Sequence, residues 1–103
     1  MSKSALTLTP VETAACCSPL LKALADPVRL RLVSIVAASE GGEACVCDLN
    51  DAFDLSQPTI SHHLKVLHSL GLLERSKRGV WVYYRIQPAA LADLGGLIGS
   101  LSA

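Results

Sequence analysis

The chain has 103 residues, of which 50% are hydrophobic and only 4% aromatic, so it is long enough for one domain with a small, mostly aliphatic core. It has no apolar run long enough to span a membrane, and its N-terminus lacks the apolar centre of a signal peptide, which predicts a cytoplasmic protein without a membrane partner. So large a share of apolar residues in so small a chain also predicts an interface with a second copy.

The formal net charge of zero hides an uneven distribution of charge along the chain. Residues 1–55 carry four basic and seven acidic side chains, whereas residues 56–87 carry five basic side chains and a single acidic one, Glu74. The positive field is therefore concentrated on residues 56–87, as expected for a segment that binds nucleic acid.

The N-terminal segment, residues 1–17, shows no sustained hydrophobic period and is predicted to form a flexible arm whose tip carries Cys16 and Cys17. Residues 18–103 are predicted to form the folded domain. A first helix over about residues 19–25 is expected to stop where Asp26 and Pro27 begin a second helix.

A helix-turn-helix is predicted in the middle of the chain. Apolar residues at intervals of three and four predict a short helix from Glu43 to Phe53, followed by a turn in which Leu55 fills the space between two helices. The next helix begins at the capping residue Ser56 and ends at Gly71. In this motif the second helix enters the major groove of DNA.

The polar face of this second helix offers short hydrogen-bonding side chains with one cation and no acid, a set suited to phosphates and base edges. The alternative is the solvated face of an ordinary amphipathic helix. The elements on either side and the local positive charge favour the first interpretation. The predicted DNA contacts from this helix are Ser56, Gln57, Thr59, Ser61, His62, His63 and Lys65.

After Gly71 the hydrophobic period changes to two, which predicts a β-hairpin with strands over residues 73–76 and 80–86. A hairpin after a recognition helix is a wing, and Lys77 and Arg78 at its tip are predicted to contact DNA phosphates; the alternative is a solvated tip. The predicted fold class is therefore mainly α with a small β-hairpin, a winged helix-turn-helix that binds double-stranded DNA.

The last predicted helix, residues 88–102, combines an apolar stripe with Gly95, Gly96 and Gly99. Each glycine costs about 1 kcal/mol in a helix interior, and close approach of another helix would explain three of them. Helices 19–25 and 88–102 are therefore predicted to form the interface of a homodimer. The alternative is a tail packed on its own domain.

The four cysteines form two close groups, Cys16-Cys17 and Cys45-Val46-Cys47, in a chain with no sign of export. Thiolates favour soft ions, and As(III), Sb(III), Cd(II) or Pb(II) would take three or four of them, so all four cysteines are predicted to bind such an ion. The arm could belong to the same subunit or to the partner. Two other interpretations stay open, namely that the cysteines are small buried hydrophobes or that they form a redox sensor.

Four stretches, residues 25–32, 43–49, 56–67 and 79–85, together resemble the ArsR/SmtB family of metal-sensing winged-helix repressors. The resemblance implies a homodimer that represses an efflux or detoxification operon and leaves its operator when an inducer binds. It also implies that Cys45 and Cys47 match the first two cysteines of the Cys-x-Cys-Asp-Leu-Cys motif of arsenic sensors, whose third position is Asn50 here. Cys16 or Cys17 is then the expected substitute, because other arsenic sensors use an adjacent pair on the arm.

The leading hypothesis is a repressor that responds to As(III) or Sb(III) and needs no organic cofactor. A Cd(II) or Pb(II) sensor is the alternative within the family, since such sensors join arm cysteines to a Cys-Val-Cys sequence. The zinc site that some members carry on the last helix is not expected, because only Asp93 is present there. An enzyme is not expected either, because no Cys-x-x-Cys lies near a βαβ pattern.

Overall fold

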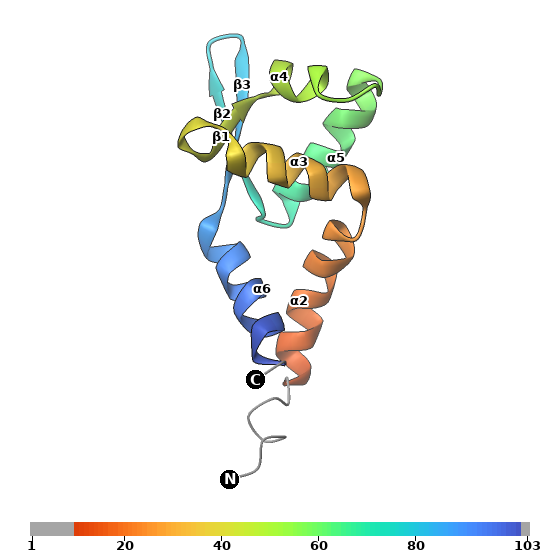
Figure 1. Ribbon diagram of the computed structural model, residues 1–103, viewed down its shortest axis with the longest axis vertical. Coiled ribbons are helices and arrows are strands. Elements are labelled where there is room, and N and C mark those ends of the chain that lie inside the picture. Colours follow the sequence, from red (N-terminus) through yellow and green to blue (C-terminus); the bar gives the residue numbers. More distant parts are fainter. Residues whose placement is uncertain (1–9, 102–103) are drawn as a thin grey trace.

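The computed structural model describes residues 10–101, which form a compact end containing a sheet and two helices that extend away from it (Figure 1). The extending helices are the first and the last ones. In chain order the elements are α2 (Val11–Leu24), α3 (Pro27–Ala38), the 3-10 turn η1 (Glu40–Gly42), β1 (Glu43–Cys45), α4 (Val46–Asp51), α5 (Gln57–Ser69), β2 (Leu73–Arg78), β3 (Trp81–Ile86) and α6 (Pro88–Ser100).

Local capping fixes the ends of the two central helices. The Asp26 carboxylate accepts hydrogen bonds from the backbone N–H of Val28 at 2.9 Å and of Arg29 at 3.1 Å, which starts α3. Ser56 Oγ accepts from the backbone N–H of Thr59 at 3.3 Å and starts α5 in the same way. Past the end of α5, Gly71 has a φ of +77°, a conformation that favours glycine. All three features were predicted from the sequence and are confirmed.

The sheet has three antiparallel strands in the order β1-β3-β2. The prediction that Glu43–Cys45 opens a helix is wrong, because these residues pair with β3, with Glu43 opposite Arg85 and Cys45 opposite Tyr83. Helix α4 therefore has only six residues. Cys45 ends the strand and caps this helix at the same time.

The hairpin is longer than the sequence predicted. Arg78 pairs with Trp81, so Lys77 and Arg78 belong to β2 and the turn consists of Gly79 and Val80. Gly79 takes a φ of +62°, as tight hairpin turns require.

The N-terminal helix begins much earlier than predicted. Helix α2 starts at Val11 and includes Cys16 and Cys17, so these residues lie on a helix rather than on a flexible arm. Its alanines and an acidic residue in its first turn, Glu12, favour helix without needing an apolar stripe. Pro19 lies inside the helix instead of opening it. Residues 1–9 of the predicted arm, and residues 102–103, lie outside the described residues.

The core is aliphatic, as the composition predicted, and lies between α3, α4, α5 and the sheet. Leu55 does not fill the turn as predicted, because it is 42% exposed and Phe53 packs against the core instead. The side chains that are less than 2% exposed are Leu32, Val36, Leu49, Ile60, Leu64, Leu67, Leu72 and Leu73.

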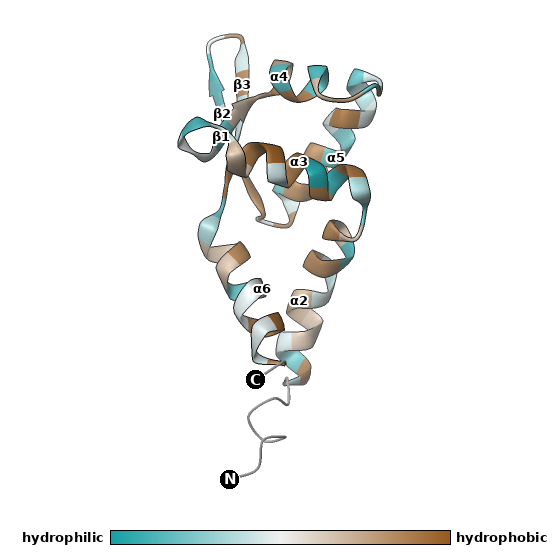
Figure 2. Ribbon diagram, viewed as in Figure 1, coloured by the Kyte–Doolittle hydropathy of each residue, from teal (hydrophilic) through white to brown (hydrophobic). Residues whose placement is uncertain are grey.

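The helices α2 and α6 carry apolar residues along much of their length (Figure 2). Leu21, Ile98 and Leu101 are between 40% and 55% exposed in the single chain. A Cβ added to Gly95 or Gly96 would meet no atom within 4 Å, so packing inside this chain does not require these glycines. Dimerisation through these helices stays a prediction. Among residues 10–101, no helix is long and apolar enough to cross a membrane.

Candidate nucleic-acid interface and thiol pair

Helix α5 buries one face completely and exposes the other. Ile60, Leu64 and Leu67 are at most 1% exposed and anchor the helix in the core. This anchoring leaves the polar side of the helix on the surface, with one cation and no acid on it. The predicted contact residues that are exposed are Ser56, Gln57, Thr59, Ser61, His62 and Lys65.

His63, by contrast, is half-buried and contacts another helix. Its Nδ1 lies 3.1 Å from a guanidinium nitrogen of Arg29, whose Nε donates to the carbonyl oxygen of Ala23 at 2.7 Å. Arg29 therefore links the end of α2 to α5. The sequence offered no indication of this link, because 34 residues separate Arg29 from His63.

Asp26 supports the same corner of the molecule. Hydrogen bonds from the backbone N–H of Arg29 and then of Val28 hold the pKa of its carboxyl below its ordinary value, and the charges of Arg29 and His63 act in the same direction. Because the folded-state pKa is lowered, this contribution to stability is present above the unfolded-state pKa of about 3.9 and is lost as the pH falls through the folded-state pKa.

The variant Asp26→Asn should therefore lack the part of the stability that depends on the charged Asp26 carboxylate. Asparagine still caps a helix but carries no charge. We expect the stability difference between wild type and variant to be constant above about pH 5 and to narrow below about pH 4. Urea unfolding between pH 3 and pH 7 measures it. Asp51→Asn, which also removes one exposed carboxylate, is the matched control. A difference that does not change with pH would contradict the assignment.

The two basic residues of the predicted wing differ in their surroundings. Arg78 forms a double hydrogen-bonded ion pair with Glu43 at 2.7 and 2.9 Å and lies 4.4 Å from the centre of the Tyr83 ring. The hydrogen bond from Arg78 lowers the pKa of Glu43, and the same bond raises the pKa of Arg78. Arg78 thus fastens β2 to β1. Lys77 is exposed, and no ion pair is found for it within residues 10–101.

The two central thiols lie together at the start of α4. Cys45 is buried and its Sγ accepts a hydrogen bond from the backbone N–H of Cys47 at 3.3 Å, while Cys47 itself is exposed. A hydrogen bond between the two side chains, together with partial burial and the nearby Cys45 and Asp48, raises the pKa of the Cys47 thiol. The Cys45 sulfur thus lies against the backbone of Cys47 where β1 meets α4.

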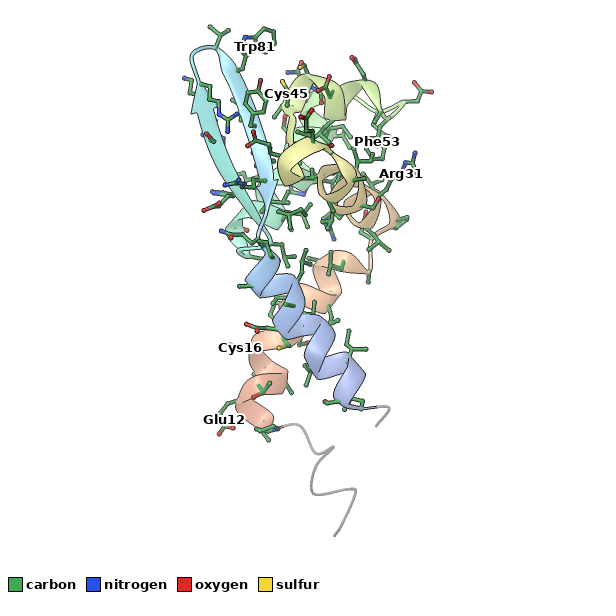
Figure 3. The ribbon with its side chains drawn as sticks, turned by 60° about the vertical axis from the view of Figure 1, so that its left-hand side comes forward. Glu12, Cys16, Arg31, Cys45, Phe53 and Trp81 are labelled. Carbon is green, nitrogen blue, oxygen red and sulfur yellow. The ribbon has the colours of Figure 1, made fainter. Side chains whose placement is uncertain are left out.

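The predicted set of four cysteines is not brought together within one chain. Cys16 lies on the extending helix α2 and Cys45 lies at the compact end, well apart from it (Figure 3). Residues 10–101 contain no group of three or more His, Cys, Asp or Glu side chains that could hold a metal ion. Asn50 adds no thiolate, and its side-chain oxygen is buried without a hydrogen-bond partner among the described residues. Within one chain, the structure therefore brings Cys45 and Cys47 together but not with Cys16.

A model of bacterial regulatory proteins of the arsR family matches residues 26–75, which run from α3 into β2. The arsenical resistance operon repressor of Staphylococcus aureus is 39% identical over 77 residues, which cover 75% of this chain and 71% of that protein. The chain belongs to the arsR family. The arsenical resistance operon repressor of Escherichia coli strain K12 is 54% identical over 69 residues, or 67% of this chain and 57% of that protein. The chain thus spans little more than half the length of this relative.

Among solved structures, that of the antimony-specific transcriptional repressor AntR superimposes with a TM-score of 0.70 at 32% identity, covering 88% of this chain and 82% of that one. This match confirms the predicted winged-helix fold class. Proteins of this family are transcriptional regulators rather than enzymes.

Proposed function

We propose that this arsR-family regulator is a repressor that binds operator DNA as a homodimer through α5 and the hairpin, and that As(III) or Sb(III) releases it by binding to cysteine thiolates. The observation that carries the proposal is the position of the thiol pair. Cys45 ends β1 and caps α4, so an ion held by Cys45 and Cys47 acts on the junction of the two elements.

Both DNA-binding elements are attached to that junction. Strand β1 pairs with β3 of the hairpin, and α4 packs against α5. Cys45 is the last residue of β1 and Cys47 belongs to the first turn of α4, so an ion bound by both thiols would hold the end of β1 against that turn. A shift at this junction would move the recognition helix relative to the wing, while the residues that touch DNA stay chemically unchanged.

The DNA contacts divide into two kinds with different expected effects. Gln57→Ala and Ser61→Ala should each weaken operator binding by about 1–3 kcal/mol and relax the sequence preference, because these side chains face base edges. Lys77→Ala should weaken binding to every DNA sequence alike and reduce the slope of log K against log salt by about 1. Fluorescence anisotropy with operator and scrambled DNA at several salt concentrations measures both. Identical behaviour of the two groups would overturn the division.

The third ligand is proposed to come from Cys16 or Cys17 of a second chain. Within one chain α2 keeps these thiols away from α4, whereas a dimer formed through α2 and α6 places a second α2 beside the first chain. The exposed apolar residues on the two extending helices support such a dimer, because its formation would bury them.

The proposal is tested by titrating the protein–operator complex with As(III), Sb(III), Cd(II) and Pb(II) under anaerobic, reducing conditions. We expect As(III) and Sb(III) to release DNA at the lowest concentrations. Release by Cd(II) or Pb(II) at lower concentrations would favour the alternative within the family. If no ion releases the DNA under reducing conditions but an oxidant does, the protein is a redox sensor and the proposal fails.

A further inference from the structure

The side chain of Arg78 reaches across the whole width of the sheet. Its strand β2 is separated from β1 by β3, yet its guanidinium forms the double ion pair with Glu43 of β1 at 2.7 and 2.9 Å. On the way the guanidinium lies over the ring of Tyr83 in β3, 4.4 Å from the ring centre. One side chain therefore ties all three strands together on one face of the sheet.

The strand register places this contact between the thiol pair and the tip of the wing. Residues two apart in a strand point to the same face, so Glu43 and Cys45 share one face of β1, and Tyr83 lies opposite Cys45. At its other end the contact begins at Arg78, which lies opposite Trp81. Trp81 and Cys45 are both found at the compact end of the molecule (Figure 3). The contact thus links the strand that ends in Cys45 to the tip of the hairpin.

The ion pair makes Arg78 a poor partner for a DNA phosphate. Both terminal nitrogens of its guanidinium donate to the Glu43 carboxylate, so a phosphate would have to displace that carboxylate or bind beside its negative charge. Lys77 differs, because no ion pair is found for it within residues 10–101 and its charge is free to neutralise a phosphate. The two neighbouring basic residues are therefore suited to different roles.

The geometry also makes this pair stronger than most exposed ion pairs. Such pairs usually contribute little, because salt screens them and ordering two long side chains costs entropy. Here the guanidinium donates two hydrogen bonds to one carboxylate and lies over an aromatic ring as well. The hydrogen bonds lower the pKa of Glu43 and raise the pKa of Arg78, which keeps both groups charged at neutral pH.

We propose that Arg78 is a positioning residue of the wing and not a phosphate contact. By holding β2 to β1 through Glu43, it sets the position of the hairpin tip relative to the strand that ends in Cys45, and it passes a shift of that strand on to the tip. The proposal rests on the proposed function for its effect on DNA, where it identifies how the wing responds to the thiol pair.

The variant Glu43→Gln separates the two roles of Arg78 by the sign of its effect on DNA binding. It removes the carboxylate and leaves the charge of Arg78 in place. A positioning residue that loses its anchor should weaken operator binding by roughly two- to fivefold, without a steeper dependence on salt. A phosphate contact freed from its partner would instead strengthen binding and steepen the slope of log K against log salt by about 1, which would overturn the proposal.

Glu74→Gln is the matched control for this variant. It removes an exposed carboxylate from the same face of the sheet, and Glu74 and Glu43 lie opposite the same residue of β3, Arg85. Any general effect of losing one negative charge near DNA should therefore appear in both variants. Only the excess effect of Glu43→Gln over Glu74→Gln is assigned to Arg78.

Reversing the charges tests the pair itself. Arg78→Glu alone should weaken operator binding, and adding Glu43→Arg should restore it to within about twofold of wild type, because the pair can then form in the opposite sense. Fluorescence anisotropy with labelled operator DNA measures both affinities. A phosphate contact would not recover, since the new carboxylate repels DNA, and a lack of recovery would overturn the proposal.

Trp81 reports on the hairpin tip in the absence of DNA, because it is the only tryptophan of the chain and is 54% exposed. Acrylamide quenching of its fluorescence should increase in Glu43→Gln, stay at the wild-type level in Glu74→Gln and return to that level in the charge-reversed double variant. Arsenite should change the quenching in wild type and not in Glu43→Gln. Equal quenching of Trp81 in wild type and Glu43→Gln would refute the positioning role.

The two readouts separate this proposal from the proposed function. A change of Trp81 quenching by arsenite that depends on Glu43, without release of operator DNA, would refute the proposed regulation and leave the positioning role standing. An equal loss of operator affinity on adding arsenite to wild type and to Glu43→Gln would do the reverse.

Discussion

Replacing Cys45 and Cys47 together with serine is expected to abolish the release of operator DNA by As(III) and Sb(III). A hydroxyl is a poor ligand for these soft ions. Mutation of a residue that only hydrogen-bonds to a metal ligand already lowers the affinity for the metal roughly 10–100-fold. Because the ligands themselves are removed here, we expect the arsenite concentration needed for release to rise by about 100-fold or more.

The choice of serine separates loss of a ligand from loss of a helix cap. The Cys45 sulfur accepts the hydrogen bond that begins α4, and serine is among the preferred residues for that role. Cys45→Ser should therefore keep α4 intact, whereas Cys45→Ala removes both the ligand and the cap. Circular dichroism and urea unfolding should show Cys45→Ala to be the less stable of the two.

Release is measured as the arsenite concentration at which half of the labelled operator DNA dissociates, with each variant first titrated onto DNA without inducer. Half-release at the wild-type arsenite concentration in the double serine variant would show that the ion binds elsewhere. A loss of release in Cys16→Ser/Cys17→Ser as well would support a ligand contributed by the second chain.

The sequence predicted best the features that depend on a few neighbouring residues. Asp26 and Ser56 predict the starts of α3 and α5, because a capping side chain hydrogen-bonds to a backbone N–H within three residues of itself. The buried stripe of Ile60, Leu64 and Leu67 is likewise set by the period of one helix. These local features were enough to predict the winged helix-turn-helix and to place its proposed DNA-reading face.

The sequence failed where distant segments decide the structure. The apolar period of residues 46–53 predicts a helix that begins at Glu43, yet residues 43–45 form a strand because β3, about forty residues later, offers hydrogen-bond partners. The pairing of Glu43 with Arg78 and the link from Arg29 to His63 depend on the same long-range arrangement. The sequence does not place Cys16 and Cys17 on a helix, because Pro19 is typical of a helix start, whereas the helix in fact begins at Val11.

Leu67→Ala is expected to destabilise the protein by about 2–5 kcal/mol, because it leaves a cavity at a position of α5 that is 0% exposed. For a domain of this size each kcal/mol lowers Tm by roughly 4–8 °C, so the loss is a large part of the total stability. The effect also reaches function, since Leu67 belongs to the stripe that holds the recognition helix in the core.

Leu30→Ala is the matched control, because it makes the same chemical change on α3 at a side chain that is 54% exposed. It should stay within about 0.5 kcal/mol of wild type. Urea unfolding at one fixed protein concentration compares the two, since a dimer would make the apparent stability depend on concentration. Equal effects of the two substitutions would mean that α5 is not anchored by its buried face. The proposed presentation of its polar face to DNA, which is derived from that anchoring, would then also be wrong.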